Sequence, residues 1–102
     1  MPSIEQIEKL LTAEPNDVFL NYSLAMEFAK LNRIDDSLAQ FNRVLELDPA
    51  YCAAYYHQGK TYLEAGRHDH AKEVLQRGMA AARQAGDGHA EGEMQELLSG
   101  IP

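Results

Sequence analysis

The chain repeats its pattern of large, small and turn-forming residues every 34 positions, and this period constrains the fold more than any other feature. Pro15 and Pro49 lie 34 residues apart. The same offset aligns pairs of similar size or character: Tyr22 with Tyr56, Phe28 with Tyr62, Arg33 with Arg67, Asp35 with Asp69, and Phe41 with Leu75. Periods of about 20–50 residues are typical of solenoids, in which each unit buries its apolar face against its neighbours. The sequence therefore predicts a stack of repeated units.

Each 34-residue unit contains two segments whose apolar residues recur at helical spacing. In the first unit we expect helices over residues 17–30 and 35–47, and in the second over residues 52–65 and 69–84. The apolar residues of the first pair are Leu20, Leu24, Phe28 and Leu31, followed by Leu38, Phe41, Val44, Leu45 and Leu47. Each unit is therefore predicted to be a pair of antiparallel helices.

Turn-forming residues separate the predicted helices. Asn32 breaks the first run, and Asp35 or Asp36 is expected to cap the helix that follows. Gly66 and Asp69 are expected to play the same two roles in the second unit. A proline ends the second helix of the first unit, because the residue before a proline avoids α-helical geometry.

Two further helices are expected at the ends of the chain, over residues 3–13 and 88–99. Each carries one apolar stripe: Ile4, Ile7, Leu10 and Leu11 in the first, and Ala90, Met94, Leu97 and Leu98 in the second. A single stripe is what a helix that closes a stack requires, so we expect end caps. The glutamates of the last helix, Glu91, Glu93 and Glu96, are expected to face outward and to be solvated.

Composition favours helix and argues against several other classes of protein. No stretch alternates like a β-strand, and Ala, Leu, Glu, Gln and Arg are abundant, so an all-α fold is expected. The single cysteine, Cys52, excludes an internal disulfide and suits a reducing compartment. Without a signal peptide or a long apolar run, we expect a cytoplasmic protein that does not contact membranes. The net charge of -7, with only 9 scattered basic residues, argues against nucleic-acid binding.

Together these features resemble the tetratricopeptide repeat (TPR), a helix–turn–helix unit of 34 residues. Counted from Val18 and Cys52, the family's pattern falls on Asn21, Leu24, Ala25, Phe28, Ser37, Phe41, Val44 and Pro49, then on Tyr55, Gln58, Gly59, Tyr62, Ala71, Leu75, Gly78 and Arg83. The resemblance implies an all-α fold, a short right-handed TPR-type solenoid of about six antiparallel helices. It implies a single domain over residues 1–102, divided into an N-terminal half-repeat helix (3–16), repeat 1 (18–51), repeat 2 (52–85) and a C-terminal capping helix (86–102).

Four positions depart from the family's pattern. Asn21 and Gln58 stand where large apolar residues are usual, and Ser37 stands where alanine is usual. Arg83 replaces the proline that ends a unit, which predicts that the second helix of repeat 2 continues toward Gly86.

Gly59 lies inside a predicted helix, where glycine costs roughly 1 kcal/mol relative to alanine. The resemblance places Gly59 and Ala25 where the first helix of a unit crosses its partner, and small residues permit close approach of two backbones. We interpret Gly59 as structural, with the burial of Tyr55, Tyr62 and Leu75 offsetting its intrinsic penalty.

No motif of enzyme chemistry is present, so the protein is expected not to be an enzyme and to need no cofactor. Cys52 lies near a helix start, where a thiol can be reactive, but it has no evident partner base, and packing as a small apolar residue is favoured. His68 and His70 flank Asp69, but no further residue completes a metal-binding spacing. We expect His68 to occupy the place that Ile34 has in the first unit, and His70 to be solvated.

The resemblance implies a concave groove, because the first helices of successive TPR units line one. The groove positions fall on Phe19, Tyr22, Met26 and Lys30 in repeat 1, and on Ala53, Tyr56, Lys60 and Glu64 in repeat 2. Aromatic anchors beside an adaptable methionine and two lysines favour an extended or helical peptide with an apolar side chain and, optionally, a carboxylate. The alternative is that Tyr22, Met26 and Tyr56 belong to the core, as stripes at helical spacing usually do.

The leading functional prediction is a non-catalytic protein–protein interaction module, an adaptor or assembly factor that binds a peptide or partner segment in this groove. Some TPR proteins hold chaperone C-termini with a Lys/Asn clamp, but Tyr22, Met26 and His57 stand at clamp positions here, so that ligand is not expected. The alternative is a small self-associating structural protein that uses the groove or a cap helix as its interface. We expect a monomer, with a weak homodimer as the alternative state.

Overall fold

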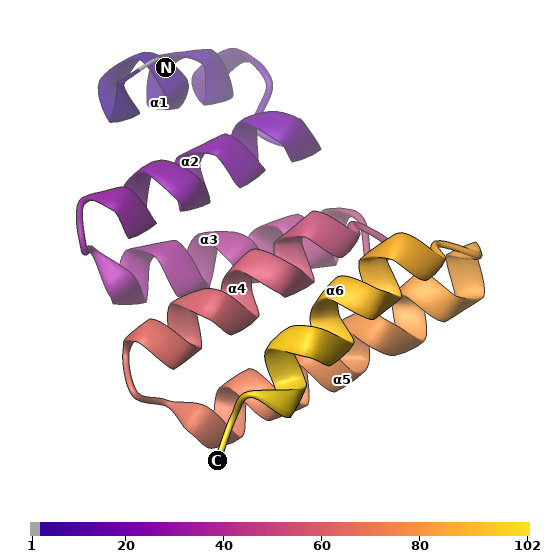
Figure 1. The fold of residues 1–102 in the computed structure, drawn as a ribbon. Coiled ribbons are helices and arrows are strands. Elements are labelled where there is room, and N and C mark those ends of the chain that lie inside the picture. Colours follow the sequence, from indigo (N-terminus) through magenta and orange to yellow (C-terminus); the bar gives the residue numbers. More distant parts are fainter. Residues whose placement is uncertain (1–2) are drawn as a thin grey trace.

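The computed structural model describes residues 3–102, which form α-helices joined by short turns (Figure 1). The helices are α1 (Ile4–Ala13), α2 (Val18–Lys30), α3 (Ile34–Leu47), α4 (Cys52–Glu64), α5 (His68–Ala85) and α6 (Gly88–Ser99). The described residues contain no strand, so the predicted all-α fold is confirmed, and every predicted helix boundary lies within one residue of the observed one. None of these helices combines the length and the apolar character that crossing a membrane demands.

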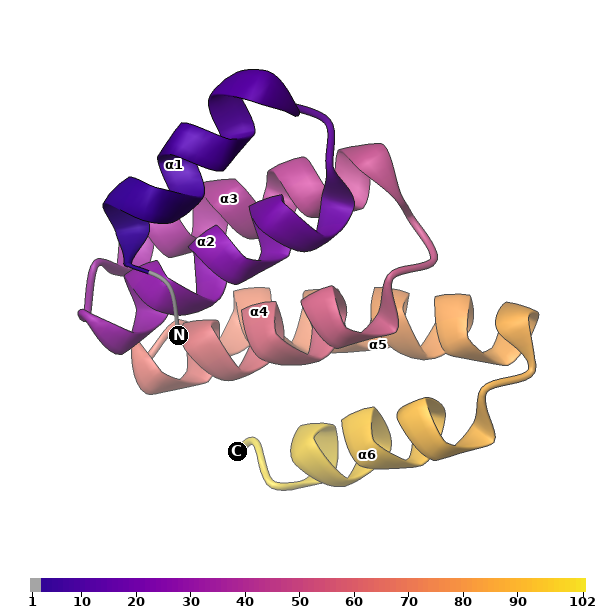
Figure 2. The same cartoon turned by 90° about the horizontal axis from the view of Figure 1, so that it is seen from above.

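The helices stack in two layers. Each helix packs against the next along the chain, and in addition α2 contacts α4 and α4 contacts α6. The helices of the other layer, α3 and α5, do not contact each other, and they lie behind α2 and α4 in Figure 2. Because α2, α4 and α6 approach one another more closely than α3 and α5 do, the stack curves around them. The molecule is thus a short helical solenoid with α2, α4 and α6 on its inner side.

The capping roles predicted for Asp35, Asp36 and Asp69 are wrong. Asn32 and Gly66 adopt left-handed backbone conformations, with φ of 58° and 75°, and the chain reverses within fewer residues than expected. The following helices therefore begin before the aspartates, each after an arginine whose side chain makes no capping hydrogen bond. All three aspartates lie in the first helical turn, where their charge favours the helix through its dipole.

Buried apolar side chains form two clusters. The larger cluster joins α2 to α6 through Ala25, Phe41, Val44, Leu45, Ala54, Tyr55, Val74, Leu75, Ala82 and Met94. The smaller cluster holds Ile7 of α1 against Leu24 and Phe28 of α2. Since α1 contacts no helix except α2, the N-terminal end of the stack is attached through α2 alone.

Close approach of helices explains the glycine inside α4, as predicted. A Cβ atom added at Gly59 would lie 2.6 Å from Cδ2 and 2.7 Å from Cγ of Leu75 on α5. Gly78 of α5 is equally confined, because its Cβ atom would lie 2.5 Å from Sδ of Met94 and from Cβ of Tyr55. Ala25, the counterpart of Gly59 in α2, is 0% exposed. Small residues therefore mark the helix crossings.

The two polar residues that replace large apolar ones are buried and hydrogen-bonded. Asn21 is 3% exposed and its Nδ2 donates to the carbonyl oxygen of Pro15 at 3.1 Å. Gln58 is 1% exposed, and its Nε2 donates to the carbonyl oxygen of Leu38 at 3.2 Å and to Oδ1 of Asn42 at 2.8 Å. Gln58 thus ties α4 to the preceding α3 by hydrogen bonds.

The second helix of the second pair is longer than its counterpart. α5 has 18 residues and α3 has 14. Arg83 continues the helix where the first unit has a proline, and α5 ends at Gly86, which has a φ of 70°. The predicted continuation toward Gly86 is confirmed.

Candidate binding face

Four of the predicted groove residues lie on α2, and they differ in exposure. The Phe19 side chain is 66% exposed. Tyr22 and Met26 are half-buried and pack against the larger apolar cluster, so each belongs partly to the surface and partly to the core. Lys30 is exposed, and its Nζ lies 3.0 Å from the carboxylate of Glu27. Phe19 is therefore the freest apolar side chain among the four.

The remaining predicted groove residues lie on α4. Tyr56 is half-buried, whereas Ala53, Lys60 and Glu64 are exposed. Together with the four α2 residues and the neighbouring surface of α6, these side chains form what we call the inner face.

An aromatic cluster links α2 to α4 on this face. The Tyr22 ring lies with its centroid 5.2 Å from that of Tyr51, 6.0 Å from that of His57 and 6.2 Å from that of Phe41. His57 in turn meets Tyr56 edge-on at 5.2 Å. His57 therefore lies between the two predicted tyrosines, although it is not one of the groove residues predicted from the sequence.

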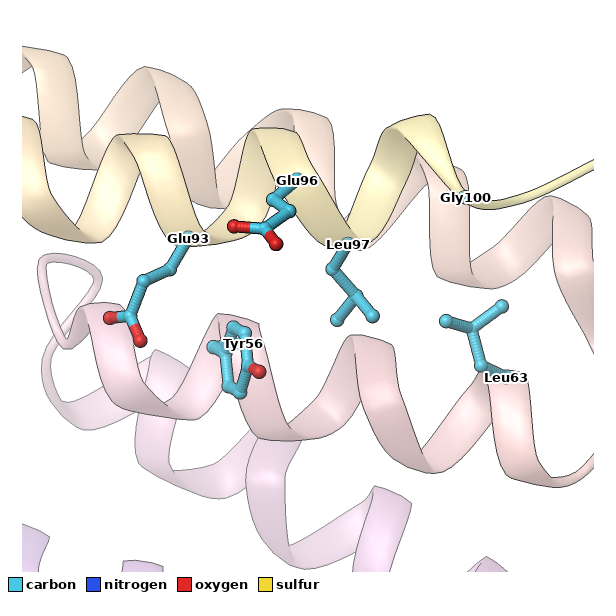
Figure 3. Close-up of a pocket in the computed structure, with 6 residues that line it drawn as sticks. All are labelled: Tyr56, Leu63, Glu93, Glu96, Leu97 and Gly100. Atoms are coloured by element: carbon cyan, nitrogen blue, oxygen red, sulfur yellow. The ribbon is translucent and has the colours of Figure 1, made fainter.

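Two neighbouring cavities open between α4 and α6, and we call them the α4–α6 depression. The first has a volume of about 400 Å³ and is lined by Tyr56, Leu63, Glu93, Glu96, Leu97 and Gly100 (Figure 3). The second, of about 290 Å³, is lined by Cys52, Ala53, Tyr56, His57, Asp87, His89, Ala90, Glu93 and Met94. Tyr56 and Glu93 line both cavities. In Figure 3 the Tyr56 ring rises from α4 toward the α6 residues.

Glu93 and Glu96 are exposed, as expected, but the expectation that they face outward is wrong, because both line the depression. α6 begins at Gly88, as predicted, which is 36 residues after α4 begins at Cys52 and two more than one repeat length. A shift of two residues turns a helix by about 200°. Glu93 and Glu96 thereby take positions in α6 equivalent to those of His57 and Lys60 in α4.

The pKa values of two side chains that line the second cavity shift in opposite directions. Burial lowers the pKa of His57 from its ordinary value of 6.5, Lys60 lowers it further, and Glu93 raises it. Burial raises the pKa of the Cys52 thiol, and the nearby Asp87 raises it again. A reactive thiol needs a lowered pKa, so Cys52 lacks the electrostatic setting of a nucleophile.

The two histidines of the α4–α5 turn lie outside this face. His68 begins α5 as Ile34 begins α3, in agreement with the prediction. His68 and His70 are both exposed, and the His70 ring stacks on Tyr62 with centroids 5.2 Å apart. Within residues 3–102, no group of three or more His, Cys, Asp or Glu side chains is arranged to hold a metal ion.

The stacked helix pairs and the curved inner face define the class of helical-repeat solenoid proteins. Family models described as TPR repeat and tetratricopeptide repeat match residues 26–66 and 53–84. A TPR repeat-containing protein of Pseudomonas aeruginosa is 30% identical over 95 residues, which span 93% of this chain and 90% of that protein. The chain therefore belongs to the tetratricopeptide repeat family.

Solved structures of TPR domains share the fold. The solution structure of a tetratricopeptide repeat domain protein from Salinibacter ruber has a TM-score of 0.75 and 36% identity, over 82% of this chain and 85% of that one. The TPR2B domain of yeast Sti1, solved as a complex with pHsp70, has a TM-score of 0.87 and 20% identity, over 94% of this chain and 77% of that one. These neighbours confirm the TPR-type solenoid.

Proposed function

We propose that the protein is a non-catalytic interaction module whose inner face binds a peptide or partner segment, in an adaptor or assembly role. TPR domains generally mediate protein–protein interaction. The proposal treats residues 18–51 and 52–85 as the two repeat units, flanked by residues 3–16 and 86–102. It assigns the binding role to Phe19, Tyr22, Met26, Lys30, Tyr56 and Lys60, and places the protein in the cytoplasm with neither membrane nor nucleic acid as its partner.

The α4–α6 depression is the observation that carries this proposal. Tyr56 lines both of its cavities, and the first cavity, of about 400 Å³, is large enough for apolar side chains of a ligand. Phe19, at 66% exposure, adds an unburied aromatic side chain on α2. Half-buried and exposed aromatic residues of this kind supply much of the binding energy in protein interfaces.

Selection of a random peptide library displayed on phage tests the proposal. We expect the wild type to enrich peptides, and we expect Phe19→Ala combined with Tyr56→Ala to weaken their binding by about 10-fold or more, since buried interface aromatics are often worth over 1.4 kcal/mol. Leu10→Ala combined with Leu31→Ala is the matched control, because those leucines are 52% and 63% exposed but lie outside the predicted groove. Circular dichroism must show that each variant keeps its helices. If the control variant lost as much peptide affinity as the variant at Phe19 and Tyr56, the inner face would not be the binding site.

Self-association is the second candidate, and the exposed Phe19 favours it, because an unpaired aromatic side chain can dock on a second copy. Sedimentation equilibrium over a range of concentrations separates the two. A monomer at all concentrations supports the adaptor, and a dimer that Phe19→Ala abolishes supports self-association.

A further inference from the structure

We propose that the α4–α6 depression selects a cationic side chain, lysine or arginine, of a peptide that also places an apolar side chain on the inner face. This inference rests on the proposed function and specifies its ligand. It replaces the carboxylate that the lysines of the sequence suggested, because the depression carries charge of the opposite sign.

The charges that line the depression are negative. Three carboxylates, those of Asp87, Glu93 and Glu96, line its two cavities, and neither lining contains a lysine or an arginine. Asp87 is partly engaged, since its Oδ1 accepts a hydrogen bond from the Ala90 backbone at 3.0 Å. The two glutamates therefore provide most of the charge available to a ligand.

Three of the five arginines are paired with carboxylates outside the depression. Glu91, two residues before Glu93, lies 2.5 Å from the Arg83 guanidinium. Asp35 and Asp36 are likewise paired with arginines at 2.9 Å. Glu93 lies 3.3 Å from the His89 imidazole, which is charged only when protonated, and Glu96 has no ion pair among the described residues. Neither glutamate that faces the depression is therefore paired with a lysine or an arginine among the described ion pairs.

The shape of the depression suits an amphipathic cation. In Figure 3 the side chains of Leu63 and Leu97 point into the space between α4 and α6 beside the Tyr56 ring, the carboxylate of Glu96 lies near α6, and that of Glu93 reaches toward α4. Lysine and arginine have apolar stems that pack on such surfaces while their charged heads remain at the edge. A cation near the Tyr56 ring gains further from the negative face of the aromatic system.

A carboxylate ligand fits the same place poorly. Lys60 is the cation next to the depression, lying one helical turn beyond Tyr56. An anion that approached Lys60 would also meet Glu93, whose charge acts on the neighbouring His57. Two glutamates, neither paired with a lysine or an arginine, against one lysine leave a net attraction for cations.

Fluorescein-labelled peptides that differ in one charge test the inference. Each carries one leucine or phenylalanine and, at varied spacing, one Lys, Arg, Gln or Glu, and its affinity is measured by fluorescence anisotropy at low and high salt. We expect the best Lys or Arg peptides to bind about 5- to 20-fold more tightly than the matched Gln peptides, as two partly exposed charge contacts allow. This preference is expected to shrink as salt increases.

The variant Glu93→Gln combined with Glu96→Gln should abolish the preference and leave the affinity for Gln peptides unchanged. Glu46→Gln combined with Glu73→Gln is the control with the same change in net charge, because both residues are exposed on the outer helices α3 and α5. The inference would be overturned if the variant at Glu93 and Glu96 still preferred Lys or Arg peptides, or if the control variant lost that preference to the same extent.

The outcomes separate the inference from the function on which it rests. If apolar peptides bind without regard to charge, or if Glu peptides bind best, and Phe19→Ala with Tyr56→Ala weakens them, the interaction module stands and cation selection is refuted. If no peptide of any charge binds, both are refuted.

Discussion

Gly59 shows how a single missing side chain sets the distance between two helices. Glycine is a poor helix former, yet the Cβ atom that alanine would add here falls within 2.7 Å of two atoms of Leu75. Leu75 is 0% exposed, so its side chain has no free space into which it can turn. The local cost of glycine is therefore smaller than the cost of the overlap that any other residue would create.

Replacing Gly59 by alanine tests this balance. We expect Gly59→Ala to destabilise the protein by about 1–2 kcal/mol, because overpacking outweighs the gain in helix propensity. Gly92→Ala in α6 is the matched control: nothing lies within 4 Å of its added Cβ, so it should stabilise by about 0.5–1 kcal/mol. Urea denaturation measures both. Adding Leu75→Ala to Gly59→Ala should remove the overlap and reduce the loss of stability that Gly59→Ala causes. Equal effects of Gly59→Ala and Gly92→Ala, or no such reduction, would contradict the close-packing explanation.

At the scale of the element, the length of α5 determines what its neighbour presents. Pro49 follows the end of α3 and prevents that helix from continuing. Arg83 stands at the equivalent position in the second unit and allows α5 to reach 18 residues. The extra turn carries the chain past the point where α6 would otherwise begin, and Gly86, with a φ of 70°, then reverses it. The longer helix and the shorter turn after it thus place α6 two residues beyond one repeat length from α4.

Restoring the family's proline tests the role of the longer helix. Arg83→Pro should cost about 3 kcal/mol or more, because it removes a hydrogen bond inside α5 and clashes with the preceding turn. In thermal denaturation this corresponds to a Tm lower by roughly 12 °C or more for a domain of this size. Arg83→Gln is the control: it loses only the ion pair with Glu91, in which Arg83 is 66% exposed, and should cost about 1 kcal/mol at most. Similar Tm values for the two variants would show that the helix does not depend on this position.

At the scale of the whole molecule, the two apolar clusters predict unequal stability along the stack. The larger cluster spans helices α2 to α6, whereas the smaller cluster joins α1 to α2 alone. In repeat proteins the stability is approximately a sum of terms for each unit and for the contacts between neighbours. A terminal helix attached to one neighbour can therefore open without unfolding the rest.

Ile7→Ala tests whether α1 is such a unit. Ile7 is 1% exposed, and its truncation should remove about 2–5 kcal/mol of local packing energy. The backbone amides of α1 should then lose their protection against hydrogen exchange, while those of α4 and α5 remain protected. Val74→Ala, at a residue 6% exposed in the larger cluster, should instead reduce protection throughout the stack. Uniform loss of protection in Ile7→Ala would mean that the whole chain unfolds as one unit.

Much of the fold could be predicted because its signals are local. Helix positions follow from the spacing of apolar residues, and the close crossing at Gly59 follows from its place in the repeat. The capping aspartates could not be predicted correctly, since the left-handed backbone at Asn32 and Gly66 moves the helix starts by one residue. The place of His57 between Tyr22 and Tyr56 was also missed, because ring contacts join residues from two helices.

The sequence by itself determined the all-α fold and the period of the stack, because these depend on intervals of a few residues and on one repeat length. The resemblance to the TPR family implied which helices face inward. Only the tertiary structure decided that Glu93 and Glu96 lie beside Tyr56. The start of α6 at residue 88 was predicted, but the orientation of the helix against α4 depends on how the chain reverses at Gly86, where φ is 70°. A shift of two residues is small along the chain, but it turns a helix by more than half a revolution and moves Glu93 and Glu96 from positions equivalent to Gly59 and Tyr62 to positions equivalent to His57 and Lys60.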